Sequence, residues 1–355
     1  MELLFDLLRL ALWDELRTKT ITKHFVTKTG IDWDEVLAMA EKQTVVPLVL
    51  QALEQEQVEL SREGRRRMLI YTQKTVKHNR KLNGEMAALV ELFRKHNVDY
   101  VVVKGQVLAS YYTHPILREG GDIDFYCDAQ SFGKAHDVVR QEWTVEEHDS
   151  DPGFHEHFSH NGVDFEMHYA LAHFYNKERD AYWEQLLRET PTVLVDVDGI
   201  QVRTLHPTVH TLYVFLHLWH HLLELGVGLR QFCDWAMILH RCSKDIDREA
   251  LQTHLKRLGL DKAFRACGCI LVDRLGLPAE DFPYVLTDRD RKYTQRILTL
   301  VNYRGNMGHY HRVGGARGWK HIMEAIAIKV SHFVKFYSLT PAYMRGWAMS
   351  LVEKV

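Results

Sequence analysis

Two acidic residues in the middle of the sequence have the type and spacing of metal ligands. Asp122 and Asp124 stand two positions apart in a segment where polar and apolar residues alternate, as they do in a half-buried strand. Both carboxylates would leave the same face of that strand, and because like charges repel at this range, we expect a divalent cation between them. Oxygen ligands of this kind suit Mg²⁺ or Mn²⁺. Replacing both aspartates by asparagine should then leave the metal-free protein at least as stable.

A third carboxylate follows an Asn161-Gly162 pair, which is typical of a hairpin turn. Beyond this turn Asp164, Glu166 and His168 alternate with apolar residues, which gives the second strand of the hairpin one polar face. We expect Glu166 to complete the set of carboxylates, with Asp164 as the alternative if the strand is shifted by two residues. His168 would either contact the substrate or hydrogen-bond a carboxylate. Three carboxylates around two cations are suited to phosphoryl transfer.

Cationic residues and a glycine lie near the aspartates in the sequence. Lys104-Gly105 ends a predicted strand and opens a helix, where a glycine lets backbone N–H groups approach a phosphate. Lys104 and Arg118 would supply positive charge to the same anion, and a guanidinium can bind it through two parallel hydrogen bonds. Arg230 and Asp234 are four residues apart on a predicted helix, so we expect them to pair. The pair is either a structural salt bridge or part of the cleft wall.

Histidines raise the alternative of a zinc site. His155 and His157 share one face of the predicted hairpin and could form half of such a site. The sequence has neither an HExxH motif nor a pair of CxxC motifs, so we do not favour zinc. His217, His220 and His221 lie on a predicted helix beside large apolar residues, and we expect them to be packing residues.

The segments that position these residues divide the chain into three regions. Residues 1–97 are predicted to be helical, near 3–17, 32–43, 45–55 and 61–96. Residues 98–205 alternate short strands and helices, with strands near 100–103, 122–126, 154–159, 163–169, 192–197 and 200–204 and helices near 106–112 and 131–141. Residues 206–355 are helical again, near 207–225, 229–241, 246–257, 261–275, 288–303, 317–338 and 341–353. The predicted fold class is α/β (α+β), a mixed-sheet core flanked by helical regions.

Composition restricts the classes of function. The net charge of −2 argues against a surface built to bind nucleic acid, so nucleic acid is an unlikely partner. Five cysteines without a pairing pattern fit a reducing, cytoplasmic location. The leucine-rich first segment carries acidic residues at helical spacing and is predicted to be an amphipathic helix and not a signal peptide. We find no apolar run of the length that spans a bilayer.

Taken in order, the motifs resemble an uncharacterised bacterial nucleotidyltransferase family of the DNA polymerase β-like nucleotidyltransferase superfamily. The resemblance rests on Lys104-Gly105, Tyr111-Tyr112, Pro115, Arg118, Gly121-Asp122-Ile123-Asp124 and Phe165-Glu166-Met167-His168. It extends to Asp32-Trp33, to the segment from Gly228 through Trp235 and to Gly305-Asn306-Met307-Gly308.

This resemblance implies a nucleotidyltransferase fold and a reaction. An NMP group would pass from an NTP to an acceptor hydroxyl, with release of pyrophosphate. Asp122, Asp124 and Glu166 would bind Mg²⁺ or Mn²⁺, and Glu166 would also position and deprotonate the acceptor. The residues that would bind the nucleotide or line the acceptor side are Lys104, Gly105, Arg118, His168, Arg230 and Asp234. The acceptor could be a small molecule, a saccharide or a protein. The alternative is a non-catalytic nucleotide-binding or interaction protein on the same fold.

Overall fold

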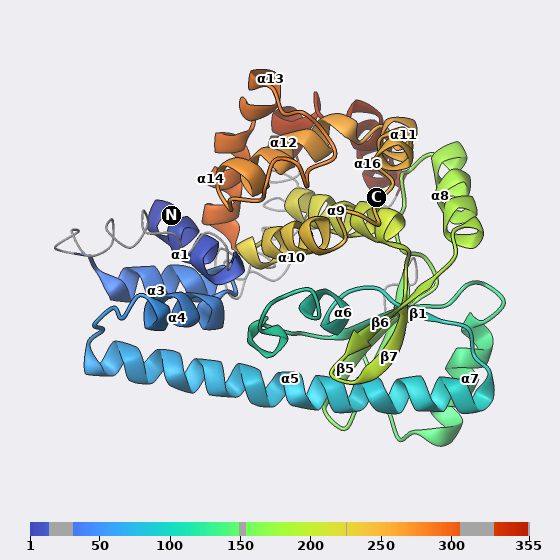
Figure 1. Ribbon diagram of the computed structural model, residues 1–355. Coiled ribbons are helices and arrows are strands. Elements are labelled where there is room, and N and C mark those ends of the chain that lie inside the picture. Colours follow the sequence, from blue (N-terminus) through green and yellow to red (C-terminus); the bar gives the residue numbers. More distant parts are fainter. Residues whose placement is uncertain (14–30, 149–153, 225, 306–329, 354–355) are drawn as a thin grey trace.

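The computed structural model describes residues 1–13, 31–148, 154–224, 226–305 and 330–353 (Figure 1). It combines helices with a five-stranded mixed sheet and a two-stranded hairpin, which confirms the predicted fold class. The segment 306–308 that carries part of the resemblance lies outside the described residues. So do parts of the helices predicted at 3–17 and 317–338.

The N-terminal region consists of helices whose ends follow from capping residues. They are α1 (Glu2–Leu12), α3 (Trp33–Lys42), α4 (Val46–Gln55) and α5 (Arg62–His96). Asp32 caps α3 by accepting hydrogen bonds from two backbone N–H groups of its first turn, and Ser61 caps α5 by accepting one from the backbone N–H of Gly64. Asn97 ends α5 in the left-handed conformation, with a φ of 50°. The 35-residue α5 runs beneath both the other N-terminal helices and the sheet (Figure 1).

The five-stranded sheet unites the segments that carry the predicted site. Its strands are β1 (Val101–Val102), β2 (Ile123–Tyr126), β3 (Glu146–Glu147), β4 (His155–His160) and β5 (Val163–His168). They are ordered β1-β2-β5-β4-β3, and β2 and β5 are parallel while the other neighbours are antiparallel. The β4–β5 turn has positive φ at Asn161 and Gly162, as the Asn-Gly pair predicts. The strands predicted near 100–103, 122–126, 154–159 and 163–169 therefore all belong to this one sheet.

Shorter elements surround the sheet. They are α6 (Gln106–Ala109), the 3₁₀ helix η2 (Pro115–Leu117), α7 (Phe132–Glu142), α8 (Lys177–Glu189) and the hairpin of β6 (Val193–Val197) and β7 (Ile200–Thr204). Helix α8 was not predicted, because it is polar nearly throughout and buries only Trp183. Its start did carry a signal, since the Asn176 side chain accepts a hydrogen bond from the backbone of Arg179.

The C-terminal region is helical, as predicted. Its helices are α9 (Pro207–Glu224), α10 (Leu229–Arg241), α11 (Arg248–Leu258), α12 (Asp261–Asp273), α13 (Asp288–Arg291), α14 (Thr294–Arg304) and α16 (Pro341–Glu353), and residues 330–336 are also helical. The single helix predicted over 288–303 is divided into α13 and α14.

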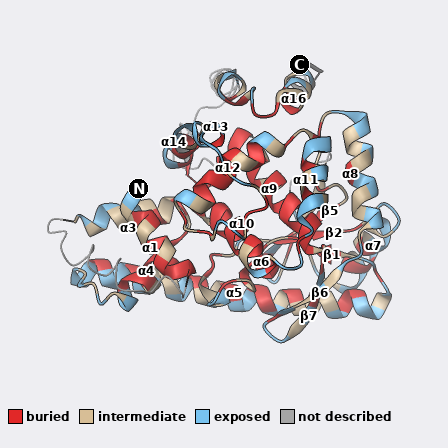
Figure 2. Ribbon diagram, turned by 45° about the horizontal axis from the view of Figure 1, so that its top comes forward, coloured by how far each residue is buried: buried red, intermediate tan, exposed pale blue. Residues whose placement is uncertain are grey.

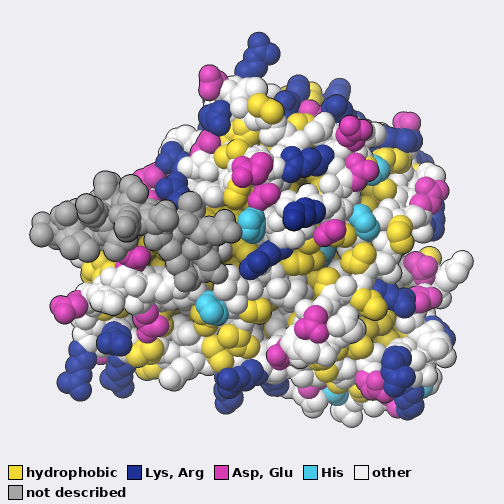
Figure 3. Space-filling view, in the orientation of Figure 1, with side chains coloured by type: hydrophobic (Ala, Val, Ile, Leu, Met, Phe, Trp, Pro, Cys, Tyr) yellow, Lys and Arg dark blue, Asp and Glu magenta, His cyan; other side chains and the backbone are white. Residues whose placement is uncertain are grey.

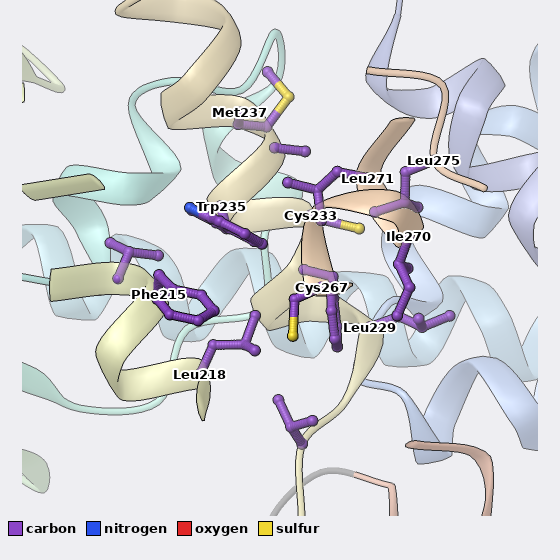
Figure 4. Close-up of a cluster of buried hydrophobic side chains, with 14 of the residues drawn as sticks. Phe215, Leu218, Leu229, Cys233, Trp235, Met237, Cys267, Ile270, Leu271 and Leu275 are labelled. Atoms are coloured by element: carbon purple, nitrogen blue, oxygen red, sulfur yellow. The ribbon is translucent and has the colours of Figure 1, made fainter. Parts of the chain in front are cut away.

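Two clusters of buried side chains hold these elements together (Figure 2). The smaller one lies between the apolar face of the sheet, which includes Phe125 and Phe165, and helices α5 and α7. The larger one contains Phe215, Trp235 and Leu271 of the C-terminal helices (Figure 4) and also the apolar residues of α1, α3 and α4. The two helical regions, although they lie at opposite ends of the sequence, therefore share one core.

A buried histidine links α9 to the strand that leads to Lys104. The His210 side chain is fully buried, and its Nε2 donates a hydrogen bond of 2.7 Å to the backbone oxygen of Val103. Burial lowers the pKa of His210 to about 4. A histidine in the unfolded chain has a pKa of about 6.5. As the pH falls below that value, the unfolded chain therefore binds more protons than the folded chain. His210 therefore stabilises the fold above pH ~6.5, and this stabilisation is lost as the pH falls towards 4.

We expect His210 to make the protein sensitive to mild acid. Between pH 7 and pH 5 its shift should lower the free energy of unfolding by about 2 kcal/mol. His210→Gln keeps a donor for Val103 and cannot titrate, so that variant should lose about 2 kcal/mol less over this range. Urea unfolding at the two pH values measures the difference. His114→Gln, at an exposed position, should behave as the unaltered protein does, and equal pH dependence in both variants would refute the assignment.

Candidate functional site

The residues singled out from the sequence line one pocket with a volume of about 550 Å³. The sheet contributes β2 and β5, and helices α9 and α10 form the opposite wall. All nine candidates contribute to the lining: Lys104, Gly105, Arg118, Asp122, Asp124, Glu166, His168, Arg230 and Asp234.

Three carboxylates converge at the sheet side of this pocket. Asp124 and Glu166 are direct partners in the parallel pairing of β2 with β5, and Asp122 immediately precedes β2. One carboxylate oxygen from each of the three lies within 4.8 Å of the others. Asp164 does not lie among the residues that line the pocket, and its carboxylate, with the side chain 57% exposed, accepts a hydrogen bond from Ser159 Oγ. Of the two alternatives, Glu166 is the one that faces the aspartates.

Lys104 neutralises part of this negative charge. Its Nζ lies 2.6 Å from Asp124 Oδ1, and the two side chains are only 12% and 2% exposed. His168 Nε2 lies 3.0 Å from the same oxygen and 3.3 Å from Glu166 Oε2. We therefore revise, for Asp124, the expectation that removing the aspartate charges leaves the metal-free protein at least as stable. Without that carboxylate, the buried ammonium of Lys104 would lose its partner.

The carboxylates differ in their tendency to ionise. Burial and the neighbouring charge of Asp124 raise the pKa of Asp122 above its ordinary value. Burial would also raise the pKa of Glu166, but the hydrogen bond from His168 and the charge of Lys104 outweigh it and lower that pKa to about 2. Glu166 is therefore ionised at neutral pH, as a metal ligand must be. A carboxylate with so low a pKa is a weak base.

Gly105 occupies a conformation that suits glycine. Its φ is 57° and its ψ −117°, and a Cβ at this residue would lie 3.1 Å from the backbone oxygen of Asp122. The residue begins α6, as predicted, although that helix has only four residues. The lack of a side chain lets the Lys104-Gly105 turn pack directly on the backbone that carries the metal-ligand candidates.

Arg118 forms a buried ion pair with Asp234. Its Nε and one terminal nitrogen donate two hydrogen bonds of 2.8 Å to the two carboxylate oxygens of Asp234, and Tyr112 OH donates to the same carboxylate. The side chains of Arg118 and Asp234 are 5% and 4% exposed. The edge of the guanidinium that could bind a triphosphate is thus occupied. The pair predicted between Arg230 and Asp234 is replaced by this buried one, because the chain folds Arg118 against α10.

Arg230 is the second arginine of the candidate set that lines the pocket. One of its terminal nitrogens donates a hydrogen bond of 2.9 Å to the backbone oxygen of Glu119. Its Nε is buried and has no hydrogen-bond partner within the described parts of the chain. A buried donor without a partner is costly, so a ligand that accepts this hydrogen bond would be favoured.

The wall opposite the carboxylates contains three histidines that we expected to be packing residues. His217, His220 and His221 of α9 line the pocket together with Tyr213. Burial lowers the pKa of His221 to about 3 and that of His217 well below its ordinary value, so both are neutral at physiological pH. The spacing of Tyr213, His217 and His221 by four residues places them on one helix face and could have revealed a polar stripe.

The carboxylate geometry fits a divalent cation. Asp122, Asp124 and Glu166 offer three oxygens close enough to share one ion. Two further groups in the described residues have suitable spacing. They are His155 with Glu166 and His168, inside the pocket, and His148 with His157 and Asp164, of which the pocket lining includes none. The histidines that raised the zinc alternative thus belong to two separate clusters.

The fold and the pocket agree with the resemblance found in the sequence. The Asp-x-Asp strand β2 pairs in parallel with the Glu-bearing strand β5 in a mixed sheet, so the motifs that carry the resemblance lie together. The chain belongs to the family described as uncharacterised nucleotidyltransferase, whose sequence model matches residues 29–276.

Other comparisons give one solved structure. The crystal structure of an antigenic nucleotidyltransferase-like protein from Paracoccidioides brasiliensis is similar to this chain at 13% sequence identity and a TM-score of 0.35. The similarity covers 58% of this chain and 94% of the other. No curated protein matches the chain at a significant level.

Within the described residues, no helix has the length and apolar character that crossing a membrane requires.

Proposed function

We propose that this protein is a metal-dependent nucleotidyltransferase that transfers an NMP group from an NTP to an acceptor hydroxyl and releases pyrophosphate. The observation that carries the proposal is the convergence of Asp122, Asp124 and Glu166 at one end of a pocket. Mg²⁺ or Mn²⁺ bound there would activate the attacking oxygen and stabilise charge on the phosphates.

The residues of the chain have distinct roles in this proposal. Asp122, Asp124 and Glu166 would hold the cation, and Glu166, as a weak base, would position the acceptor hydroxyl while its proton passes to water. Lys104 and Arg230 are the cationic side chains that supply charge to the triphosphate. His168 orients the carboxylates of Asp124 and Glu166 through its hydrogen bonds instead of holding the nucleotide.

The remaining candidates have supporting roles. Arg118 and Asp234 form the buried pair that fixes α10 against the loop before β2. Gly105 lets the turn approach Asp122. The wall of α9 leaves a partly apolar space for the acceptor, beside Leu216 and Tyr213.

Loss of the Arg230 guanidinium should weaken NTP binding. A hydrogen bond to a charged group contributes about 1.5–3 kcal/mol, so Arg230→Ala should raise the Kd for NTP with Mg²⁺ by roughly 10- to 100-fold. Arg230→Lys should recover part of the affinity, because it restores the charge without the fork of donors. Titration calorimetry with each NTP measures the effect. Arg241→Ala, on the same helix but outside the pocket lining, is the matched control, and equal Kd values for the two alanine variants would exclude Arg230 from the nucleotide site.

Radioactive NTPs test the reaction itself. The protein is incubated with Mg²⁺, a cell extract as the source of acceptor, and each NTP labelled either at the α-phosphate or at the γ-phosphate. Transfer of NMP moves the α label to the acceptor and leaves the γ label in pyrophosphate. Asp122→Asn protein in the same extract is the control. Transfer of the γ label would indicate a kinase instead, and absence of any transfer despite Mg²⁺-dependent binding would favour the second candidate.

That second candidate is a non-catalytic nucleotide-binding or interaction protein. One observation favours it: Lys104 and Arg118, both expected to bind triphosphate, pair with Asp124 and Asp234 inside the protein. Such a protein would bind NTP in the same pocket without turnover. The labelling experiment separates the two candidates.

The acceptor is proposed to be a small molecule, a saccharide or a protein. Nucleic acid remains the less favoured partner, because acidic and basic side chains are interspersed over the face shown in Figure 3. We also propose a cytoplasmic location, on the ground that the sequence shows no pairing pattern among its five cysteines.

A further inference from the structure

Two imidazoles flank the carboxylate that the proposed metal site contributes from β5. His155 Nε2 lies 3.8 Å from Glu166 Oε1, and His168 Nε2 lies 3.3 Å from Glu166 Oε2. The three ligand atoms lie within 4.8 Å of one another. The side chains are 20%, 23% and 9% exposed for His155, Glu166 and His168, and all three line the pocket.

The pairing of β4 with β5 builds this group. His155 and His168 are direct partners across the two antiparallel strands, and their rings are 5.1 Å apart. Glu166 is two residues from His168 on β5, so its side chain leaves the same face of the sheet. Because rigid strands carry all three donors, their mutual positions do not depend on a loop.

The environment of Glu166 differs from that of Asp124 in one respect that matters for metal binding. Asp124 Oδ1 has the ammonium of Lys104 at 2.6 Å and His168 Nε2 at 3.0 Å, and a charged ammonium cannot ligate a metal. The groups nearest to the Glu166 oxygens include two imidazoles, which are common metal ligands. A cation can therefore bind at Glu166 without displacing Lys104 from Asp124, and His168 Nε2 would exchange its proton and its hydrogen bonds to the carboxylates for the metal.

We propose that His155, Glu166 and His168 form a second metal site that selects a first-row transition-metal dication, such as Mn²⁺, Co²⁺ or Zn²⁺, over Mg²⁺. Two imidazoles and one carboxylate suit these metals, whereas Mg²⁺ prefers oxygen ligands only. The site rests on the proposed function only in sharing Glu166 with Asp122 and Asp124. Glu166 thus belongs to two neighbouring sites of different composition. The site with Asp122 and Asp124 offers oxygen ligands only, and the site with His155 and His168 offers one oxygen and two nitrogen ligands.

The test measures Co²⁺ binding to the full-length protein after a chelator has removed metals. Every protein in the test carries His157→Ala, so that the separate cluster of His148, His157 and Asp164 cannot bind the probe. Visible absorption of Co²⁺ reports nitrogen coordination, and titration gives its Kd. His155→Ala should weaken Co²⁺ binding at least about tenfold, because it removes one of three protein ligands. A large excess of Mg²⁺ should leave the Co²⁺ spectrum of the parent protein unchanged.

His173→Ala is the matched control, because His173 lines the same pocket but is not part of the cluster. Its Co²⁺ affinity should stay within about twofold of the parent's. Circular dichroism verifies that each variant is folded. If the His155→Ala protein does not fold, the His155→Gln protein is used in its place. Equal Co²⁺ affinity in the His155 and His173 variants, or displacement of Co²⁺ by Mg²⁺, would overturn the proposal. Co²⁺ binding that needs His155 in a protein that transfers no NMP would refute the proposed function and leave this site standing.

Discussion

Asp122→Asn is expected to abolish Mg²⁺-dependent NMP transfer while the protein stays folded. Loss of a metal ligand removes several kcal/mol of charge stabilisation from the transition state, which corresponds to a rate at least roughly 10³-fold lower. The fold should tolerate the change, because burial and the repulsion from Asp124 already disfavour the Asp122 carboxylate, as its raised pKa indicates. Without metal, the free energy of unfolding of the Asp122→Asn protein should be equal to or higher than that of the unaltered protein.

Asp124→Asn should abolish transfer as well, but with a loss of stability. Asp124 is the carboxylate that pairs with the buried Nζ of Lys104. Removing one partner of a buried ion pair costs about 3–5 kcal/mol, so the two aspartates, equivalent in the sequence, should differ in unfolding experiments. Lys104→Met introduced together with Asp124→Asn should recover part of the loss, since it removes the unpaired charge.

Two measurements on the same proteins test these expectations. Transfer of the α label from NTP measures activity, and urea unfolding without metal measures stability. Asp164→Asn is the matched control, because this carboxylate shares the strand face of Glu166 but lies outside the pocket. It should retain transfer. Full activity of Asp122→Asn, or unfolding of that variant, would refute the metal site as proposed.

The second large effect is expected at the pair of Arg118 and Asp234. Arg118→Ala leaves the Asp234 carboxylate buried with only Tyr112 as a hydrogen-bond donor among the partners identified. We therefore expect the free energy of unfolding to fall by about 3–5 kcal/mol. The doubly substituted protein, Arg118→Met with Asp234→Leu, should be more stable than either single variant, because no buried charge remains unpaired. The sequence alone suggested a different contribution of Arg118, namely positive charge for the phosphates of the nucleotide.

Arg67 and Glu41 provide a control of the same geometry at the surface. Arg67 donates two hydrogen bonds, of 2.9 and 2.7 Å, to the two oxygens of Glu41, but the side chains are 50% and 25% exposed. Arg67→Ala should cost no more than about 1 kcal/mol. Urea unfolding of the two alanine variants measures the contrast that burial produces. Similar losses in both would show that the pair at Arg118 is not the structural support described here.

Several features of the site could be predicted from local sequence. The alternation of polar and apolar residues along 122–126 and 163–168 assigns Asp124, Glu166 and His168 to one face of the sheet, because side chains in a strand alternate between its faces. The Asn161-Gly162 pair defines the hairpin that sets the register. Gly105 was expected at a turn, and its positive φ accords with that. These features depend on backbone geometry over a few residues.

Only the tertiary structure decided which charges pair and which faces meet. Arg118 and Asp234 are 116 residues apart. The local spacing instead predicts that Asp234 pairs with Arg230 on the same helix. The histidines of α9 line the pocket because α9 crosses the polar face of the sheet, and an amphipathic pattern does not say which element will cover it. The shared core of the first and last helices is likewise invisible in sequence order. Local periodicity determines where a side chain points within its element, whereas its partner depends on how the elements pack.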